Sequence, residues 1–125
     1  MNRFVLSLGS NSSDRYEKMD MTIERLNSLL NIEAASSVYE TLPWGGGDKL
    51  YINCVMAGTT AMDKESLIEM TKKWEKQCGR DEEAKKHGIV PIDLDIVIWN
   101  DTVLRPKELS RDYFITGYRQ IDPCH

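Results

Sequence analysis

Two aspartates, Asp93 and Asp95, stand two residues apart in the segment "VPIDLDIVIWN" (residues 90–100). The segment is otherwise apolar and predicts a strand, on which side chains alternate between faces, so both carboxylates should lie on the same face. Carboxylates roughly 7 Å apart along a strand repel each other unless a positive charge compensates them. Mg²⁺ prefers hard oxygen ligands and often binds one or two carboxylates together with substrate phosphates. The spacing therefore favours a site for metal-bound phosphates.

The same alternation assigns the rest of this strand to two faces. Val97 should share the face of the two aspartates. A second interpretation of the aspartates stays open, in which both are solvated on an open sheet face or paired with Lys or Arg. The residues expected to face the helices are Ile92, Leu94, Ile96 and Ile98.

The elements that position these aspartates follow from hydrophobic periodicity and turn residues. Apolar residues recur every three to four positions over residues 15–30, as they do on one face of a helix. Asp63 is a good N-cap for a second helix, and Gly79 is a good residue to end it. The order strand–helix–strand–strand–helix–strand predicts an α+β, ferredoxin-like β-α-β-β-α-β sandwich, with an antiparallel sheet and two helices on one face. Strands are predicted over residues 3–8, 32–41, 50–60 and 92–99, and helices over 15–30 and 63–78, with Met19, Ile23, Leu26 and Leu30 on one face of the first helix and Leu67, Met70 or Thr71, Trp74 and Cys78 on one face of the second.

The bulk composition excludes several classes of protein. A chain of 125 residues with 41% hydrophobic and 29% charged residues fits a single folded domain over residues 1–125. The net charge of −4 gives no reason to expect nucleic-acid binding, and no apolar run is long enough to predict a membrane span. Three scattered cysteines without zinc-ligand spacing predict a reduced, cytoplasmic protein.

Five segments occur together in a recognisable order: "SLGSN" (7–11), "SSVYETLPWG" (36–45), "YIN" (51–53), "WEKQCGR" (74–80) and "DLDIVIW" (93–99). With them the chain resembles the 6-hydroxymethyl-7,8-dihydropterin pyrophosphokinase family of folate biosynthesis, over roughly residues 3–100. The resemblance implies the ferredoxin-like fold and transfer of diphosphate from ATP to a pterin alcohol, giving AMP. It also implies two Mg²⁺ ions as cofactors, and we expect the protein to act as a monomer.

The resemblance assigns a role to each candidate site residue. A flat pterin ring needs an aromatic surface and an amide partner, which Tyr51 and Asn53 would supply. For Tyr51 core packing is an equal alternative, and for Glu75 a solvated position on a helix is an equal alternative. The implied sets are Asp93 and Asp95 for the metals, Asp93, Asp95 and Arg80 for catalysis, Thr41, Leu42, Pro43, Trp44, Tyr51, Asn53 and Tyr118 for the pterin, and Glu75, Arg80 and Ile96 for the nucleotide.

The loop before the aspartates departs from the family pattern. It reads "GRDEEAKKHGIVPIDLD", and the basic residues and tryptophan that the family has there are replaced by Glu82, Glu83, His87 and Val90. Fewer charge-assisted contacts would weaken phosphate binding. A pyrophosphokinase-like module that binds a pterin or nucleotide without turnover is therefore the alternative function. We also expect a mobile loop between Arg80 and Val90, with His87 as a surface residue.

Overall fold

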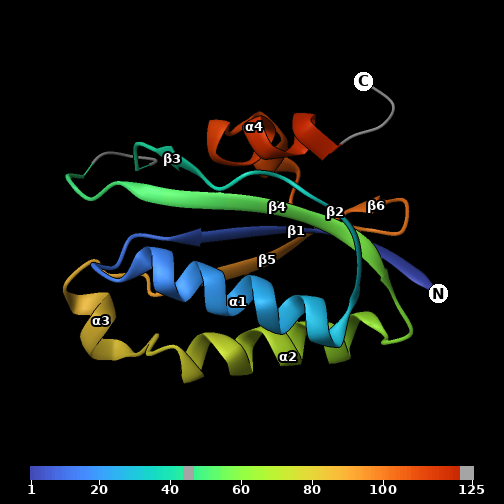
Figure 1. The fold of residues 1–125 in the computed structure, drawn as a ribbon, viewed down its shortest axis with the longest axis horizontal. Helices are drawn as coiled ribbons and strands as arrows, with labels where there is room; N and C mark the ends of the chain where they lie inside the picture. Colours follow the sequence, from blue (N-terminus) through green and yellow to red (C-terminus); the bar gives the residue numbers. More distant parts are fainter. Residues whose placement is uncertain (44–46, 122–125) are drawn as a thin grey trace.

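The structure is a computed structural model that describes residues 1–43 and 47–121 (Figure 1). Its strands are β1 (Asn2–Ser10), β2 (Asn31–Ala35), β3 (Tyr39–Thr41), β4 (Tyr51–Thr60), β5 (Asp93–Trp99) and β6 (Thr102–Val103). Its helices are α1 (Arg15–Leu29), α2 (Lys64–Gln77), α3 (Glu82–Lys86), the 3₁₀ helix η1 (Pro106–Ser110) and α4 (Asp112–Ile121).

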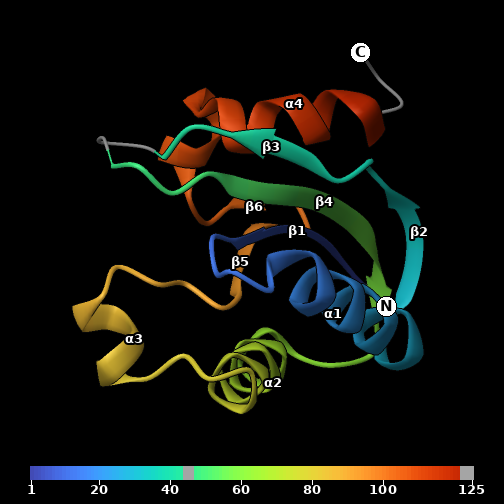
Figure 2. The same cartoon turned by 60° about the vertical axis from the view of Figure 1, so that its left-hand side comes forward.

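The strands form one antiparallel sheet in the order β2-β4-β1-β5-β6, with β3 also paired to β4. Helices α1 and α2 cover one face of this sheet (Figures 1 and 2). This is the predicted ferredoxin-like arrangement, and its α+β class is confirmed. Helix α4, which the sequence did not predict, covers the opposite face, so the fold has three layers (Figure 2).

The main core lies between the sheet and the α1–α2 layer. The predicted apolar faces of both helices are buried there: Met19 and Leu26 of α1 are each 1% exposed and Leu67 of α2 is 0% exposed. The ends of α2 also follow the prediction. Asp63 accepts a hydrogen bond from the Ser66 amide at 2.8 Å, and Gly79 follows the helix with a φ of 98°, a conformation that favours glycine.

A smaller core holds α4 against the other face of the sheet. Val55, Val97 and Phe114 are fully buried in it. The approach is close at Gly117, where a Cβ atom would lie 2.6 Å from Val55 Cγ2 and 2.7 Å from the Tyr39 hydroxyl. Only glycine fits at this position, which explains a residue that otherwise weakens a helix.

Two details of the predicted strands are wrong. The register between β1 and β5 passes from Val5–Ile98 to Leu6–Ile96, so Val97 is an extra residue in a β-bulge. The bulge turns Ile98 toward the α4 side, instead of the face predicted for it. The stretch 32–41 is divided into β2 and β3. Between them the Ser36 hydroxyl accepts a hydrogen bond from the Val55 amide of β4, which replaces regular strand pairing.

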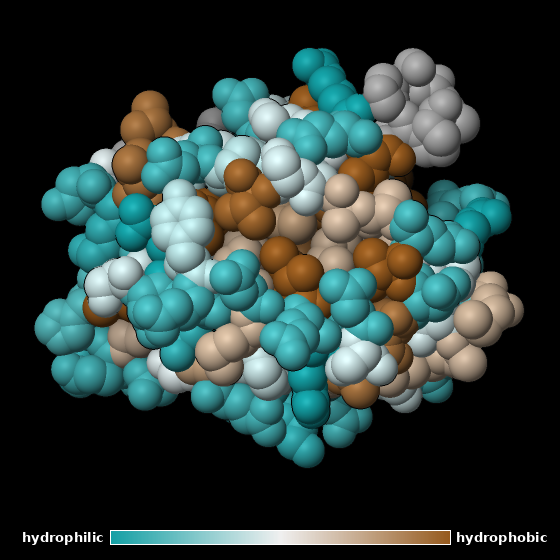
Figure 3. Space-filling view, in the orientation of Figure 1, coloured by the Kyte–Doolittle hydropathy of each residue, from teal (hydrophilic) through white to brown (hydrophobic). Residues whose placement is uncertain are grey.

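The face of the molecule in Figure 3 is largely hydrophilic. Its exposed hydrophobic residues gather in the middle, between the α4 layer and the layer of α1 and α2. None of the helices in the described part of the chain combines the length and the hydropathy that a membrane span requires.

Candidate active site

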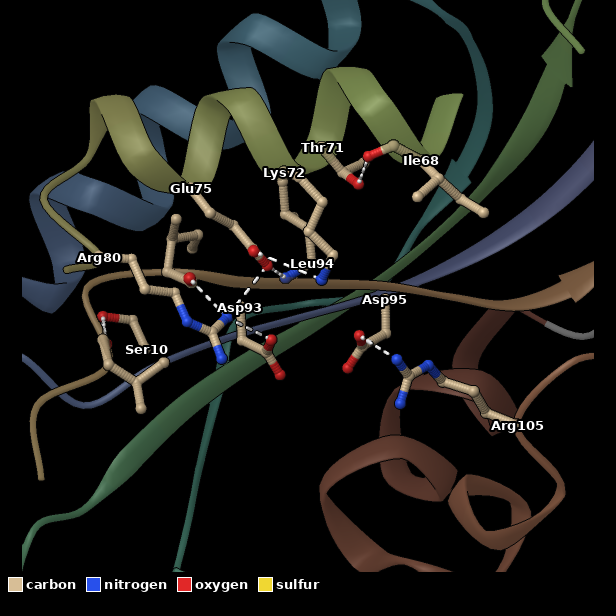
Figure 4. A network of polar contacts seen from close by, with 12 residues as sticks. Ser10, Ile68, Thr71, Lys72, Glu75, Arg80, Asp93, Leu94, Asp95 and Arg105 are labelled. Atoms are coloured by element: carbon tan, nitrogen blue, oxygen red, sulfur yellow. Dashed lines mark hydrogen bonds and ion pairs between the residues drawn. The ribbon is translucent and has the colours of Figure 1, made fainter. Parts of the chain in front are cut away.

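Asp93 and Asp95 lie on the same side of β5, as the alternation of strand side chains predicts. Figure 4 shows both carboxylates on the side that faces away from α2. Leu94, between them, is 1% exposed in the core under the two helices. The two acidic groups thus lie on the α4 face of the sheet, while Leu94 and Ile96 of β5 are buried in the main core on the other face.

Asp93 is connected to α2 through Arg80. The Arg80 guanidinium Nη1 lies 2.6 Å from Asp93 Oδ1 and 3.0 Å from Glu75 Oε2. Glu75 is only 4% exposed, and the same Oε2 accepts the Leu94 amide at 2.8 Å. The solvated interpretation of Glu75 is therefore wrong: the residue is buried and fixes both Arg80 and the start of β5.

Asp95 is the more buried of the two carboxylates, with a side chain 13% exposed. Arg105 Nη2 lies 3.1 Å from its Oδ1. Burial raises the pKa of Asp95 to about 7, the negative charge of Asp93 adds to this, and the charge of Arg105 opposes it. Both aspartates are thus paired with arginine, and the charge of Arg105 does not fully offset the burial of Asp95.

A row of three residues crosses the sheet beside the aspartates. Asn53 of β4 is paired with Gly9 of β1, and Gly9 with Asp93 of β5. Gly9 has no side chain, so the sheet is hollowed between the amide and the carboxylate; a Cβ atom there would lie 3.4 Å from Asn53 Oδ1. The hollow is part of a cavity of about 410 Å³.

The cavity contains most of the residues that the resemblance assigns to the pterin. Asn53 Nδ2 donates to Thr41 Oγ1 at 2.7 Å, which orients the amide and leaves its oxygen as an acceptor. Burial raises the pKa of Tyr51, so its hydroxyl stays protonated. Trp44 lies outside the described residues. The predicted residues that line the cavity are Thr41, Leu42, Pro43, Tyr51, Asn53 and Asp93.

Filling the hollow at Gly9 is expected to block the cavity without unfolding the protein. Gly9→Val introduces a residue that strands favour, at a position whose Cβ meets its nearest neighbour at 3.4 Å. We expect pterin affinity to fall at least about tenfold because the branched side chain occupies the ring's space. Fluorescence titration with 6-hydroxymethylpterin measures this, and Gly9→Ala, with one carbon only, is the control. Equal affinity in Gly9→Val and the wild type would place the ligand elsewhere.

Five described residues of the implied site are not among those that line this cavity. Glu75, Arg80 and Asp95 belong to the ion pairs at the carboxylates, and the other two are packed in the cores. Ile96 is 6% exposed in the core beneath α1 and α2. Tyr118 packs in the smaller core, where its ring stacks on Phe114 with centroids 5.2 Å apart. The residues that line the cavity include neither of them.

Two residues beside the site were not predicted. Arg105 is brought back to β5 by the β5–β6 hairpin, in which its amide donates to the Val97 carbonyl at 3.4 Å. A hairpin after residue 99, counted in register, would have placed Arg105 near Asp95. Tyr113, from the first turn of α4, lines the cavity. It belongs to α4, in which Phe114, Tyr118 and Ile121 have the i, i+4, i+7 spacing that could have indicated a helix.

The segment between Arg80 and β5 is held at its far end by Asn11. The Asn11 side chain accepts the Val90 amide at 2.6 Å and donates to the Gly88 carbonyl at 2.9 Å. The segment also contains α3, and His87 is exposed there and lies 3.0 Å from Glu83. The mobility expected of this segment stays a prediction.

The acidic pair fits a cation that brings other ligands with it. Within residues 1–43 and 47–121 no group of three or more His, Cys, Asp or Glu side chains is placed to hold a metal. Asp93 and Asp95 together offer two hard carboxylates on one face, and the raised pKa of Asp95 shows that a further positive charge would be favourable there. This donor set suits Mg²⁺ completed by phosphate oxygens rather than a structural metal.

Comparison with known proteins identifies the family. The profile described as 7,8-dihydro-6-hydroxymethylpterin-pyrophosphokinase matches residues 5–123. A 2-amino-4-hydroxy-6-hydroxymethyldihydropteridine pyrophosphokinase of Aquifex aeolicus is 36% identical over 127 residues, 94% of this chain and 79% of that protein. A protein of the same name from Porphyromonas gingivalis is 32% identical over 99 residues, 74% of this chain and 66% of that protein. A folate synthesis bifunctional protein of Arabidopsis thaliana is 30% identical over 112 residues, 83% of this chain but 23% of that longer protein.

The match runs through the segments that form the site. It extends from β1, which carries Gly9, to the end of α4, so the sheet, both helical layers and the cavity all fall inside it. The chain belongs to the 7,8-dihydro-6-hydroxymethylpterin-pyrophosphokinase family, a family of enzymes.

Proposed function

We propose that the protein transfers the terminal diphosphate of ATP to the hydroxymethyl group of 6-hydroxymethyl-7,8-dihydropterin, as a step of folate biosynthesis. Its family and the names of its relatives support this activity. The observation that carries the proposal is the double position of Asp93, which is one of the two carboxylates and also lines the cavity. Phosphates bound at the carboxylates would therefore meet a ring bound in the cavity.

The carboxylates would hold the metal ions, of which the resemblance implies two. Bound Mg²⁺ would neutralise phosphate charge and hold the phosphates for an in-line attack. Arg80 and Arg105 now pair with Asp93 and Asp95 at 2.6 and 3.1 Å. With cations at the carboxylates, the pairs with Asp93 and Asp95 would be exchanged for pairs with phosphate oxygens, while Glu75 would keep its contact with Arg80.

The cavity residues would orient the alcohol. The substrate hydroxyl oxygen forms a bond to the β-phosphorus of ATP, and the bond from that phosphorus to the oxygen bridging to the α-phosphate breaks. The electron pair leaves with AMP, and the hydroxyl proton passes to solvent. Asn53, fixed by Thr41, would recognise the ring edge, so that the hydroxymethyl group points toward Asp93.

A binding module without turnover is the second candidate. The observation that favours it is α3, whose first turn carries Glu82 and Glu83, both exposed, beside the exposed Lys85 and Lys86. This short helix contributes no net positive charge to the loop that precedes the aspartates, where a triphosphate would need it.

One assay separates the two candidates. Incubation with ATP, Mg²⁺ and 6-hydroxymethyl-7,8-dihydropterin is expected to yield AMP, measured by chromatography, and Asp93→Asn should lower the rate. Asp101→Asn is the matched control, because Asp101 is exposed in the β5–β6 turn, with 94% of its side chain accessible. Pterin binding in calorimetry without AMP would favour the module, and the absence of both would refute the proposal.

Action as a monomer in the cytoplasm is part of the proposal. Cys54 and Cys78 are buried free thiols, which suits a reducing compartment. Light scattering on the purified protein measures the oligomeric state.

A further inference from the structure

A second row of residues crosses the sheet beside the row that contains Gly9. Ser7 of β1 is paired with Val55 of β4 on one side and with Asp95 of β5 on the other. Residues two apart on a strand share a face, so Ser7 lies on the same face as Gly9. Opposite side chains on antiparallel strands have Cβ atoms about 4.5–5.5 Å apart. Ser7 is therefore a direct neighbour of Asp95, one step along β1 from the hollow at Gly9.

The Ser7 side chain is largely buried but reaches the cavity. The residue is 7% exposed, and it lines the cavity of about 410 Å³ to which the hollow at Gly9 belongs. Its neighbour Asp95 is not among the residues that line this cavity. Ser7 thus links the space in which the pterin ring would bind to the carboxylate that would hold the cations.

The Ser7 hydroxyl has no hydrogen-bond partner within residues 1–43 and 47–121. Buried hydroxyls usually have one, because an unpaired hydroxyl loses the hydrogen bonds that water would give it. The preceding residue on the same face of β1, Val5, packs against the smaller core under α4. An apolar side chain at position 7 would extend that core, whereas serine presents a donor and an acceptor to the cavity.

We propose that the Ser7 hydroxyl hydrogen-bonds the hydroxymethyl oxygen of the substrate and so selects pterins that carry an alcohol. The assignment rests on the proposed function, since it names a residue of the same site. The ring lies over the hollow at Gly9, where a Cβ atom would be 3.9 Å from Tyr51 Cδ2. Its one-carbon arm points along β1 to Ser7 and so toward the carboxylates. The substrate hydroxyl donates to Ser7, which leaves the lone pairs of the substrate oxygen free for the phosphorus.

Such a contact distinguishes an alcohol from a methyl group. A hydroxyl that is fixed in the wall of a site loses its partner when a methyl analogue binds, which lowers the affinity for that analogue. Removing the Ser7 hydroxyl should therefore weaken binding of the alcohol only. A purely structural role for Ser7 would change the affinity for both ligands by the same factor.

Fluorescence titration with 6-hydroxymethylpterin and with 6-methylpterin tests this. Both titrations are run with Mg²⁺ and α,β-methylene-ATP, which cannot release its diphosphate, so that turnover does not enter the result. Ser7→Ala is expected to weaken binding of 6-hydroxymethylpterin about five- to tenfold, as the loss of one neutral hydrogen bond does, and to change binding of 6-methylpterin less than about twofold. Ser28→Ala is the matched control, because Ser28 is exposed on α1 and does not line the cavity.

Each outcome decides between distinct conclusions. Thermal unfolding verifies that the variants fold, and Ser7→Cys, which has nearly the size of serine but only a weak donor, replaces the alanine variant if that one does not. Unchanged affinities in the variant overturn the assignment, as does an equal loss for the two pterins. A wild type that binds both pterins equally well also overturns it. A wild type that binds neither pterin overturns the proposed function itself, and the assignment with it.

Discussion

Replacing Asp95 with asparagine is expected to lower the rate of diphosphate transfer at least about a thousandfold, because an amide cannot neutralise the cations that would carry the phosphates. The same change is expected to raise the free energy of unfolding above pH 7. The side chain of Asp95 is 13% exposed and lies near the charge of Asp93 on the same side of β5. The carboxylate of Asp95 is thus expected to be needed for activity and to destabilise the fold above pH 7.

The pH dependence follows from the pKa of Asp95, which folding raises from 3.8 to about 7. The folded protein binds this proton more tightly than the unfolded chain does. The contribution of Asp95 to stability is therefore fully present below pH 3.8 and is lost as the pH rises through about 7. At pH 8 the ionised carboxylate costs on the order of 2–4 kcal/mol, which asparagine removes.

Urea unfolding of the wild type and Asp95→Asn at pH 5 and pH 8 measures this. The stability difference between them should be larger at pH 8, and Asp101→Asn, on the exposed turn, should show no such dependence. Mg²⁺ with ATP should raise the melting temperature of the wild type more than that of the variant. A variant that is less stable than the wild type at pH 8 would show that the carboxylate is adequately compensated by Arg105.

The parts of the fold that sequence patterns predicted are those in which local and tertiary preferences agree. On α1 the repeat of Met19, Ile23 and Leu26 follows the helical period, and the same residues fill the main core. Asp63 caps α2 because its side chain prefers that position in any helix. The aspartate pair was recognised for the same reason, since strand alternation alone puts both carboxylates on one face.

Helix α4 was not predicted, although Phe114, Tyr118 and Ile121 have the i, i+4, i+7 spacing of a helix face, because its other residues have a poor local preference for helix. Ile115 and Thr116 are β-branched, and Gly117 costs about 1 kcal/mol relative to alanine. The helix is stabilised by contacts across the chain, with Phe114 buried against the sheet and Gly117 beneath the Tyr39 hydroxyl. Tyr113 was missed for that reason, and Tyr118 was placed in the site instead.

Helix α3, in contrast, has clear local signals for a helix, but its high charge led to the prediction of a loop. Asp81 accepts the Ala84 amide at 2.9 Å as an N-cap. Glu82 and Glu83 occupy the first turn, Lys85 and Lys86 the last, and Gly88 follows with a φ of 67°. Each of these favours a helix. The absence of apolar residues predicts its exposure but does not exclude the helix.

Replacing Glu75 with alanine is expected to lower the free energy of unfolding by about 2–4 kcal/mol. The change leaves the buried Leu94 amide without its acceptor and Arg80 without one of its two carboxylate partners. The loss is smaller than the roughly 3–5 kcal/mol of a fully buried ion pair, because the Arg80 side chain is 39% exposed and solvent screens its charge. Urea unfolding measures the loss, and Glu69→Ala, on the exposed face of α2, is the matched control.

The conservative change Glu75→Gln distinguishes a positioning residue from a nucleotide contact. Glutamine keeps an acceptor for the Leu94 amide but loses the charge that holds Arg80 at 3.0 Å. If Glu75 acts through Arg80, Glu75→Gln should lower kcat while the KM for ATP changes little. A direct nucleotide contact would instead raise the KM for ATP with little effect on stability.

A double-mutant cycle with Arg80→Ala completes the argument. Arg80 contacts both Glu75 and Asp93 through the same Nη1 atom, so the loss of either partner alters how the arginine meets Asp93. The effects of Glu75→Gln and Arg80→Ala on kcat should therefore be far from additive, since the second change removes the group through which the first one acts. Additive effects would mean that the two residues serve separate steps, and the buried chain from α2 to the carboxylates would then be structural only.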